Sequence, residues 1–353
     1  MKKLVYGLTA CIAAVILIVA CNKSNTAGSS NSPTTDGTTP AQLQTQADDE
    51  TQVSNELDAS TDDINNTLNS VSALSGSTTT GFTGGVVVDG GNAGIITNGG
   101  NGGTVVDGGN GGPVIVAIDG ICDARVTIDT ASGLRVITIT YNGSDCWVHH
   151  ERVRSGKVVI TIPVGVRWKD AGAVVTVSFE NLKIVRLRDH KTITLNGTYT
   201  YTNVTGGLLK DLPTLGTITH TIAADSVTIQ FADSATRIWS VAKQRVFTYN
   251  DGIVVTTTGT HSDGTNNDVS VWGTNRFGNS FETMIVQPKV IAQSCDDRLT
   301  GGETETIRPA VTYTITYGLD VNGNPTTCPG SGYYYYKIVW TKNGKTYTFI
   351  APY

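Results

Sequence analysis

The alternation of apolar and polar positions changes character near residue 120. Beyond it, single apolar residues alternate with Thr or Ser, as in residues 137–141, 175–179 and 311–317. A period of two is typical of antiparallel strands that place one face on a core and the other in solvent. Threonine is β-branched and polar, which suits the solvated face. The same alternation recurs in residues 158–162, 193–201 and 227–231.

Turn signals separate these segments. They are Asn142-Gly143, Asp251-Gly252, Asp263-Gly264 and Asn343-Gly344. Such pairs supply the positive φ angles that tight hairpins require. We therefore predict an all-β fold for residues 121–353, with a large antiparallel sheet in a sandwich-like domain. An open, curved meander or a barrel also satisfies the pattern.

Residues 43–75 follow a helical period instead. Val53, Leu57, Ile64, Leu68 and Val71 recur at spacings of 4, 7, 4 and 3, which places them on one helix face. The acidic residues fall mostly elsewhere on the helix; they include Asp48, Asp49, Glu50, Asp58, Asp62 and Asp63. We predict one amphipathic helix whose apolar stripe packs on the β domain or self-associates weakly. Binding of a separate partner is the alternative.

Polar segments flank this predicted helix. Residues 22–42 hold almost no large apolar residue, so they cannot offset the entropy of ordering and are predicted to be a flexible linker. Residues 76–120 are glycine-rich, and residues 88–94 recur in similar form at 106–112. Two copies are too few for a solenoid. We predict a flexible stalk made of a linker (21–42), the helix (43–75) and a spacer (76–120), followed by the β domain.

The N-terminus has the features of an export signal. A basic start at Lys2 and Lys3 precedes an apolar stretch over residues 4–20 and then Cys21. A secretory signal has this order, although the stretch is nearly long enough for a transmembrane helix. The residues Ile18-Val19-Ala20-Cys21 resemble the lipobox of bacterial lipoproteins. The resemblance implies removal of residues 1–20 and lipidation of Cys21.

With its polar tether and Thr-rich β domain, the chain is similar to uncharacterised envelope lipoproteins of Bacteroidota. The resemblance implies an anchor in the outer membrane that does not span it. An acidic run near the lipid marks surface export in some of these proteins, but here the first acid is Asp36. The absence of this acidic run favours the periplasmic face of the outer membrane, and the cell surface is the alternative. These lipoproteins have no established activity, so the resemblance implies none for this chain.

Charge is unevenly distributed along the chain. Residues 22–120 hold 11 acidic residues and one lysine, whereas residues 121–353 hold 22 basic and 19 acidic residues. Neither part has the clustered basic stripe of a nucleic-acid-binding protein, so we expect no nucleic-acid partner.

Four cysteines lie in the predicted β domain, and an exported domain would use them in disulfides. Cys122 and Cys295 each begin a Cys-Asp-x-Arg motif, and a Thr-Ile-Thr-Tyr strand and then Cys146 or Cys328 follow. This parallel order favours the pairs Cys122–Cys146 and Cys295–Cys328. Cross-linking between the copies, 122–328 with 146–295, is the alternative.

Catalytic motifs are missing from the sequence. It has no Gly-x-Ser-x-Gly elbow and no phosphate-binding glycine loop before a helix. His149 and Glu151 could share one strand face, but zinc requires three or four ligands, so we expect no metal and no cofactor. Glu303 and Glu305 could also share a face, where two solvated charges are the ordinary interpretation.

Aromatic residues give the better candidate surface. The segment 272–279 combines Trp272, Asn275, Arg276 and Phe277, and exposed rings on a β scaffold can stack on sugars or anchor proteins. Tyr333–Tyr336 must alternate between faces on a strand, so at most two of them point outward.

The leading hypothesis is a non-catalytic, membrane-anchored envelope lipoprotein with a binding or structural role. A glycan-binding or glycan-acting surface protein is one alternative, and a cleft with convergent carboxylates of raised pKa would favour the acting form. An adhesin-like module that binds an envelope protein is the other. It predicts a contiguous exposed apolar patch.

Overall fold

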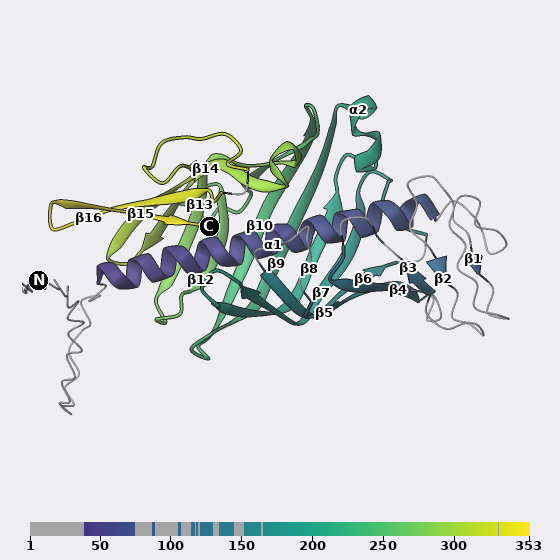
Figure 1. The fold of residues 1–353 in the computed structure, drawn as a ribbon, viewed down its shortest axis with the longest axis horizontal. Coiled ribbons are helices and arrows are strands. Elements are labelled where there is room, and N and C mark those ends of the chain that lie inside the picture. The colour runs from purple at the N-terminus through teal and green to yellow at the C-terminus, as the bar shows by residue number, and fades with distance from the viewer. Residues whose placement is uncertain are drawn as a thin grey trace, which may run out of the picture. The chain divides into compact units, whose positions relative to one another are not determined.

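The alternating segments form strands that pair in chain order (Figure 1). The computed structural model describes residues 39–74, 87–88, 105–106, 114–116, 118, 121–129, 134–144, 152–163, 165–330 and 332–353. The strands are β1 (Val87–Val88), β2 (Val105–Val106), β3 (Val114–Val116), β4 (Ala124–Asp129), β5 (Arg135–Asn142), β6 (Arg152–Ile162), β7 (Ala173–Arg186), β8 (Thr192–Asn203), β9 (Thr217–Phe231), β10 (Thr236–Tyr249), β11 (Ile253–Gly259), β12 (Val269–Thr274), β13 (Ser280–Ala292), β14 (Arg298–Arg308), β15 (Val311–Leu319), β16 (Tyr335–Lys342) and β17 (Lys345–Pro352).

The pairing is a continuous antiparallel meander. Each strand from β2 to β10 pairs with the next. Strand β10 then pairs with both β11 and β12, and each of these pairs with β13, after which the meander continues to β17. Among the described strands, only β1 and β2 pair in parallel. The sheet thus includes β3, which lies in the segment that the sequence assigns to a spacer.

A row of β-bulges crosses the sheet from β6 to β10. The register shifts between Ser155 and Lys157, and again in each of the next three pairings. Bulges bend a strand and increase its twist. Gly156 lies in the first bulge with a φ of 104°, where an added Cβ would lie 2.1 Å from the carbonyl oxygen of Asn181. Only glycine allows this close approach between β6 and β7.

The predicted helix is present as α1 (Pro40–Leu74), and Figure 1 shows it lying across the strands of the sheet. Its 35 residues give a length of about 52 Å. Leu43 and Ala47 pack in a cluster with residues of β9–β11 and β13–β16, whereas Val53, Leu57, Ile64 and Leu68 pack in a second cluster with residues of β4–β10 and β13. A single-turn helix, α2 (Leu212–Leu215), and the 3-10 turns η2 (Leu209–Asp211) and η3 (Gln293–Cys295) complete the described elements.

The prediction of an all-β fold with a large antiparallel sheet and one preceding helix is confirmed. Packing of the apolar stripe on the β domain, the first of the two interpretations, is also confirmed. The helix does not stand apart in a stalk, because Thr38–Tyr353 form one compact unit. Its polar side chains are buried as well, including Thr51 and Ser60 at 0 % exposure, so strands cover it on more than its apolar face.

Candidate functional site

Helix α1 carries seven acidic residues and no basic one. They are Asp48, Asp49, Glu50, Glu56, Asp58, Asp62 and Asp63. All except Asp62 are buried, with at most 8 % of each residue exposed. Buried carboxylates require cations or hydrogen-bond donors, because removal from water strongly disfavours an isolated charge. The surroundings of α1 are therefore the first place to look for a functional site.

The side of the sheet that faces α1 supplies these cations. Arg152 and Arg154 are two residues apart on β6, and so are Lys243 and Arg245 on β10. The two side chains of each pair therefore lie on the same face of their strand. The other cations are Arg186 on β7, Lys289 on β13, and Arg188, Lys191 and Arg276 in loops. Scattered through the sequence, these residues converge on one helix.

Arg154 forms the most deeply buried of these ion pairs. Its Nη1 donates to Asp63 Oδ2 at 2.7 Å, and its Nε and Nη2 donate to the two carboxylate oxygens of Asp123, each at 2.8 Å. The hydroxyl of Tyr141 also donates to Asp63, at 2.7 Å. Burial, together with the charge of Asp63, raises the pKa of Tyr141 well above its ordinary value, so this hydroxyl stays a donor.

Arg186 makes the equivalent contact near the start of the helix. Its Nη1 and Nη2 donate to the two oxygens of Asp48 at 3.1 and 2.8 Å, and the Lys191 ammonium also contacts Asp48. Burial alone would raise the pKa of Asp48, but Arg186 and Lys191 hold it below its ordinary value. Two further pairs extend the series along α1: Arg152 with Glu56 at 2.9 Å and Arg245 with Asp62 at 3.2 Å.

The loop predicted to bind a ligand contacts α1 through two of its four residues. Arg276 donates to both oxygens of Asp49 at 2.6 and 2.7 Å. Asn275 is 2 % exposed and donates to Gln46 at 2.7 Å. Trp272 stacks on His261 with ring centroids 4.0 Å apart, and Phe277 is 38 % exposed. The structure therefore brings Asn275 and Arg276 to the helix and leaves Phe277 at the surface.

Glu50 is buried without a cation among its hydrogen-bond partners in the described residues. Its carboxylate accepts from the Tyr313 hydroxyl at 2.5 Å, Gln46 Nε2 at 2.7 Å and the Thr306 hydroxyl at 2.9 Å. Burial raises the pKa of Glu50, and these three donors offset that effect only in part. Glu50 is thus one of the acids of α1 whose protonated form burial favours, together with Asp49 and Asp62, whose pKa values burial raises to about 7.

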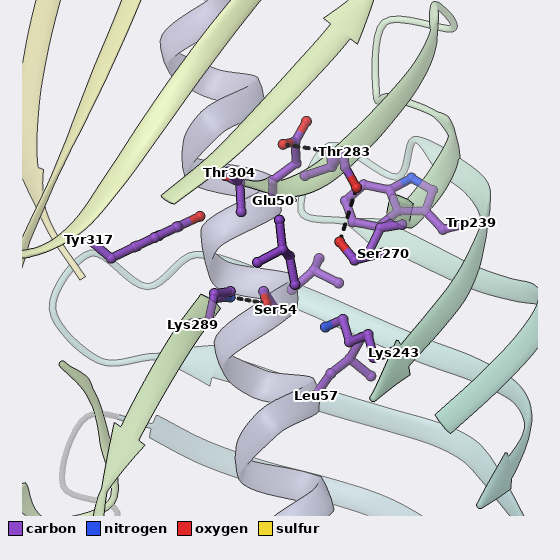
Figure 2. A pocket seen from close by; sticks show the side chains of 13 residues that line it. Glu50, Ser54, Leu57, Trp239, Lys243, Ser270, Thr283, Lys289, Thr304 and Tyr317 are labelled. Carbon is purple, nitrogen blue, oxygen red and sulfur yellow. Dashed lines mark hydrogen bonds between the residues drawn. The ribbon is translucent and has the colours of Figure 1, made fainter. Parts of the chain in front are cut away.

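A cavity of about 30 Å³ lies beside Glu50, between α1 and strands β10, β12, β13, β14 and β15. Figure 2 shows Lys243 and Lys289 entering it from different strands, with Ser54 of α1 between them and Leu57 beside Lys243. Lys289 donates to the Ser54 hydroxyl at 2.6 Å and lies 3.9 Å from Asp58. Burial lowers the pKa of Lys289 to about 8 and also lowers that of Lys243.

The disulfide prediction is confirmed for one pair. Cys295 and Cys328 are bonded, with Cα atoms 5.1 Å apart, which rules out cross-linking between the two copies of the motif. Cys146 lies outside the described residues, so the pair Cys122–Cys146 stays a prediction. Cys21 and the rest of the lipobox also lie outside them.

The other candidate residues lie apart from α1 or in the core. Glu303 accepts a hydrogen bond from Thr316 at 3.0 Å within the sheet. Tyr334 and Tyr336 are fully buried and Tyr333 is 41 % exposed, which fits the expected alternation. His149, His150 and Glu151 lie outside the described residues.

In the described part of the chain, no three His, Cys, Asp or Glu side chains are arranged to hold a metal ion. None of the helices in that part combines the length and the apolar character needed to cross a bilayer.

Comparison of the chain with known protein families, with curated proteins and with solved structures gives no match. The geometry around α1 is therefore the principal guide to function.

The sequence interpretation missed the cations that face α1. A signal for them exists: Arg-x-Arg at 152–154 and Lys-x-Arg at 243–245 place two cations on one strand face, and a helix elsewhere carries only acids. Counting charges over whole segments hid this pattern, since the basic residues of the sheet are nearly balanced by acids in the same segment.

Proposed function

We propose that the chain is an exported protein, anchored in the outer membrane through a lipid on Cys21, whose β domain is a non-catalytic structural or binding module of the cell envelope. Its first partner is the membrane. Several acyl chains on one cysteine would hold it firmly, because each buried CH₂ contributes about 0.8 kcal/mol.

The burial of α1 carries this proposal. The helix begins at Pro40, 19 residues after Cys21, and enters the core of the β domain. Arg186, Arg152 and Arg154 bind it at successive points along its length. A pull on the tether would therefore act on a helix that is enclosed by the sheet, which suits a module that must stay attached to its anchor.

The carboxylates of α1 support a non-catalytic role. Asp48, Asp49 and Asp63, which could otherwise act as acids or bases, each accept hydrogen bonds from an arginine of the sheet or its loops. A glycan-acting enzyme needs a pair of carboxyl groups that flank its substrate. Here these groups are used to hold the helix.

The anchor is tested by comparing Cys21→Ser with Cys11→Ser in a bacterial host that lipidates exported proteins. Cys11→Ser is the matched control, because it removes a cysteine from the same segment without touching the expected cleavage site. The measurements are incorporation of a labelled fatty acid, mass of the mature N-terminus and distribution between membrane and soluble fractions.

We expect the wild type and Cys11→Ser to be acylated, cleaved before Cys21 and found in the membrane fraction. Cys21→Ser should lose the label and should not be found as an acylated membrane form. A wild-type chain without acylation, or with residues 1–20 retained, contradicts the proposal.

A further inference from the structure

Three cations of the sheet gather around one turn of α1. Arg245 on β10 lies opposite Thr257 on β11, which lies opposite Lys289 on β13, so the two cations share one row of the sheet. Lys243 lies two residues before Arg245 on the same face. The three side chains are buried, with Arg245 0 % and each lysine 4 % exposed.

The acids near these cations are Asp58, Asp62 and Glu50, and burial, with the charge of Asp297 also contributing, raises the pKa of Asp62 to about 7. Asp58 lies 3.9 Å from Lys289, and its pKa is held below its ordinary value by Lys243, Lys289 and Arg245 against the effect of burial. Asp62 pairs with Arg245 at 3.2 Å. Glu50 also lines the cavity, but its carboxylate is bound by hydroxyl and amide donors, and burial favours its neutral form.

Some N–H groups of this cluster have no hydrogen-bond acceptor among the described residues. Among the described residues the Lys243 ammonium has no hydrogen-bond partner, although the charge of Asp58 acts on it, and Figure 2 shows it directed toward α1 beside Leu57. The Nε and Nη1 atoms of Arg245 likewise have no hydrogen-bond partner among the described residues. A buried ammonium that lacks hydrogen-bond acceptors favours a further acceptor nearby, even with Asp58 acting on its charge.

We propose that the cavity between α1 and strands β10–β15 binds a small monovalent anion, of the size of chloride, between Lys243 and Lys289. The anion balances the surplus positive charge and accepts hydrogen bonds from the Lys243 ammonium.

The size of the cavity selects the anion. About 30 Å³ is room for two water molecules or one monatomic ion. Sulfate carries two charges, so its desolvation costs more than that of chloride, and gluconate, with six carbons, is much larger than a monatomic ion. Val53, Leu57 and Ile285 form apolar walls, which disfavour a strongly hydrated ion. The site should therefore accept chloride and bromide and reject sulfate.

Two experiments on the folded wild-type and variant chains test the site. Crystals soaked in bromide and measured at the bromine absorption edge should show an anomalous peak between Lys243 and Lys289. Thermal unfolding in sodium chloride and in sodium gluconate, at equal pH and ionic strength, should give a Tm about 2–4 °C higher in chloride when the site is largely filled.

Lys243→Met should abolish the difference in Tm between chloride and gluconate. Lys183→Met is the matched control, because Lys183 is an exposed lysine on β7, and it should keep the difference. The bromide map uses the wild type, so it tests the site even if Lys243→Met does not fold. Water alone in the cavity, equal Tm values in the two salts, or a difference that persists in Lys243→Met overturns the proposal.

Discussion

At Arg154, one guanidinium binds Asp63 of the helix and Asp123 from the segment before β4. The desolvation of three buried charges offsets much of their attraction, so such a network is weak evidence for net stability. Removing one charged group from the network is strongly destabilising, because the remaining charges stay buried without their partner. The network therefore serves mainly to fix where α1 lies against β6.

Arg154→Met should lower the free energy of unfolding by about 3–5 kcal/mol, because both carboxylates lose the guanidinium that they share. Arg167→Met is the matched control, since its pair with Asp170 is exposed and should contribute at most about 1 kcal/mol. Urea unfolding of both variants measures the difference. Equal losses in the two variants would show that the buried network does not hold the helix.

The raised pKa of Glu50 predicts how the stability of the fold changes with pH. Its raised pKa means that the folded chain keeps a proton that the unfolded chain releases above about pH 4.5. The contribution of Glu50 to stability therefore falls as pH rises from 5 to 8. Glu50→Gln removes this effect, so the stability of the wild type relative to the variant should decrease over that interval.

Urea unfolding of the wild type and Glu50→Gln at pH 5 and pH 8 measures this change. The other titrating groups are shared by the two chains and cancel in the comparison. The decrease can reach about 1.4 kcal/mol for each pH unit over which the folded chain alone holds the proton. A difference that is constant, or that grows with pH, contradicts the interpretation of Glu50.

Among the elements, those with a clear period could be predicted from the sequence. The expected helix at 43–75 is observed at Pro40–Leu74, and the alternating segments 137–141 and 311–317 lie within β5 and β15. Asn343-Gly344 forms the turn between β16 and β17 with φ angles of 52° and 72°. These features depend on local patterns, so one sequence suffices to find them.

The position of α1 inside the sheet could not be predicted in the same way. Asp49 and its partner Arg276 are 227 residues apart, and Glu50 and Tyr313 are 263 residues apart. No local period connects such residues. An apolar stripe also suggests that the opposite face of the helix is solvated, whereas here buried arginines replace water for Asp48 and Asp63. The candidate site depends on these contacts and was therefore missed.

The disulfide shows how far a repeated motif can be used. The parallel order of the Cys-Asp-x-Arg segments correctly favoured Cys295–Cys328. The same motif did not indicate that Asp123 binds Arg154, because that contact depends on the register in which β4, β5 and β6 pair. The similarity of the two motifs therefore predicted the disulfide, but it did not predict how the motif packs in the fold.

On the scale of the whole molecule, the sheet and the helix depend on each other. The two apolar clusters each contain residues of α1, so the helix contributes to both, as do strands β9, β10 and β13. In the proposed anchored state, the tether leads directly into this shared core. The central claim is therefore that α1 is a structural part of the β domain and not a segment of a free stalk.

Native-state hydrogen exchange tests this claim most directly. Amides of α1 between residues 46 and 68 should exchange as slowly as those of β8 and β9, because they can open only when the core opens. Protection lost from α1 within seconds, while β8 and β9 remain protected, would show that the helix leaves the sheet independently and would contradict the account.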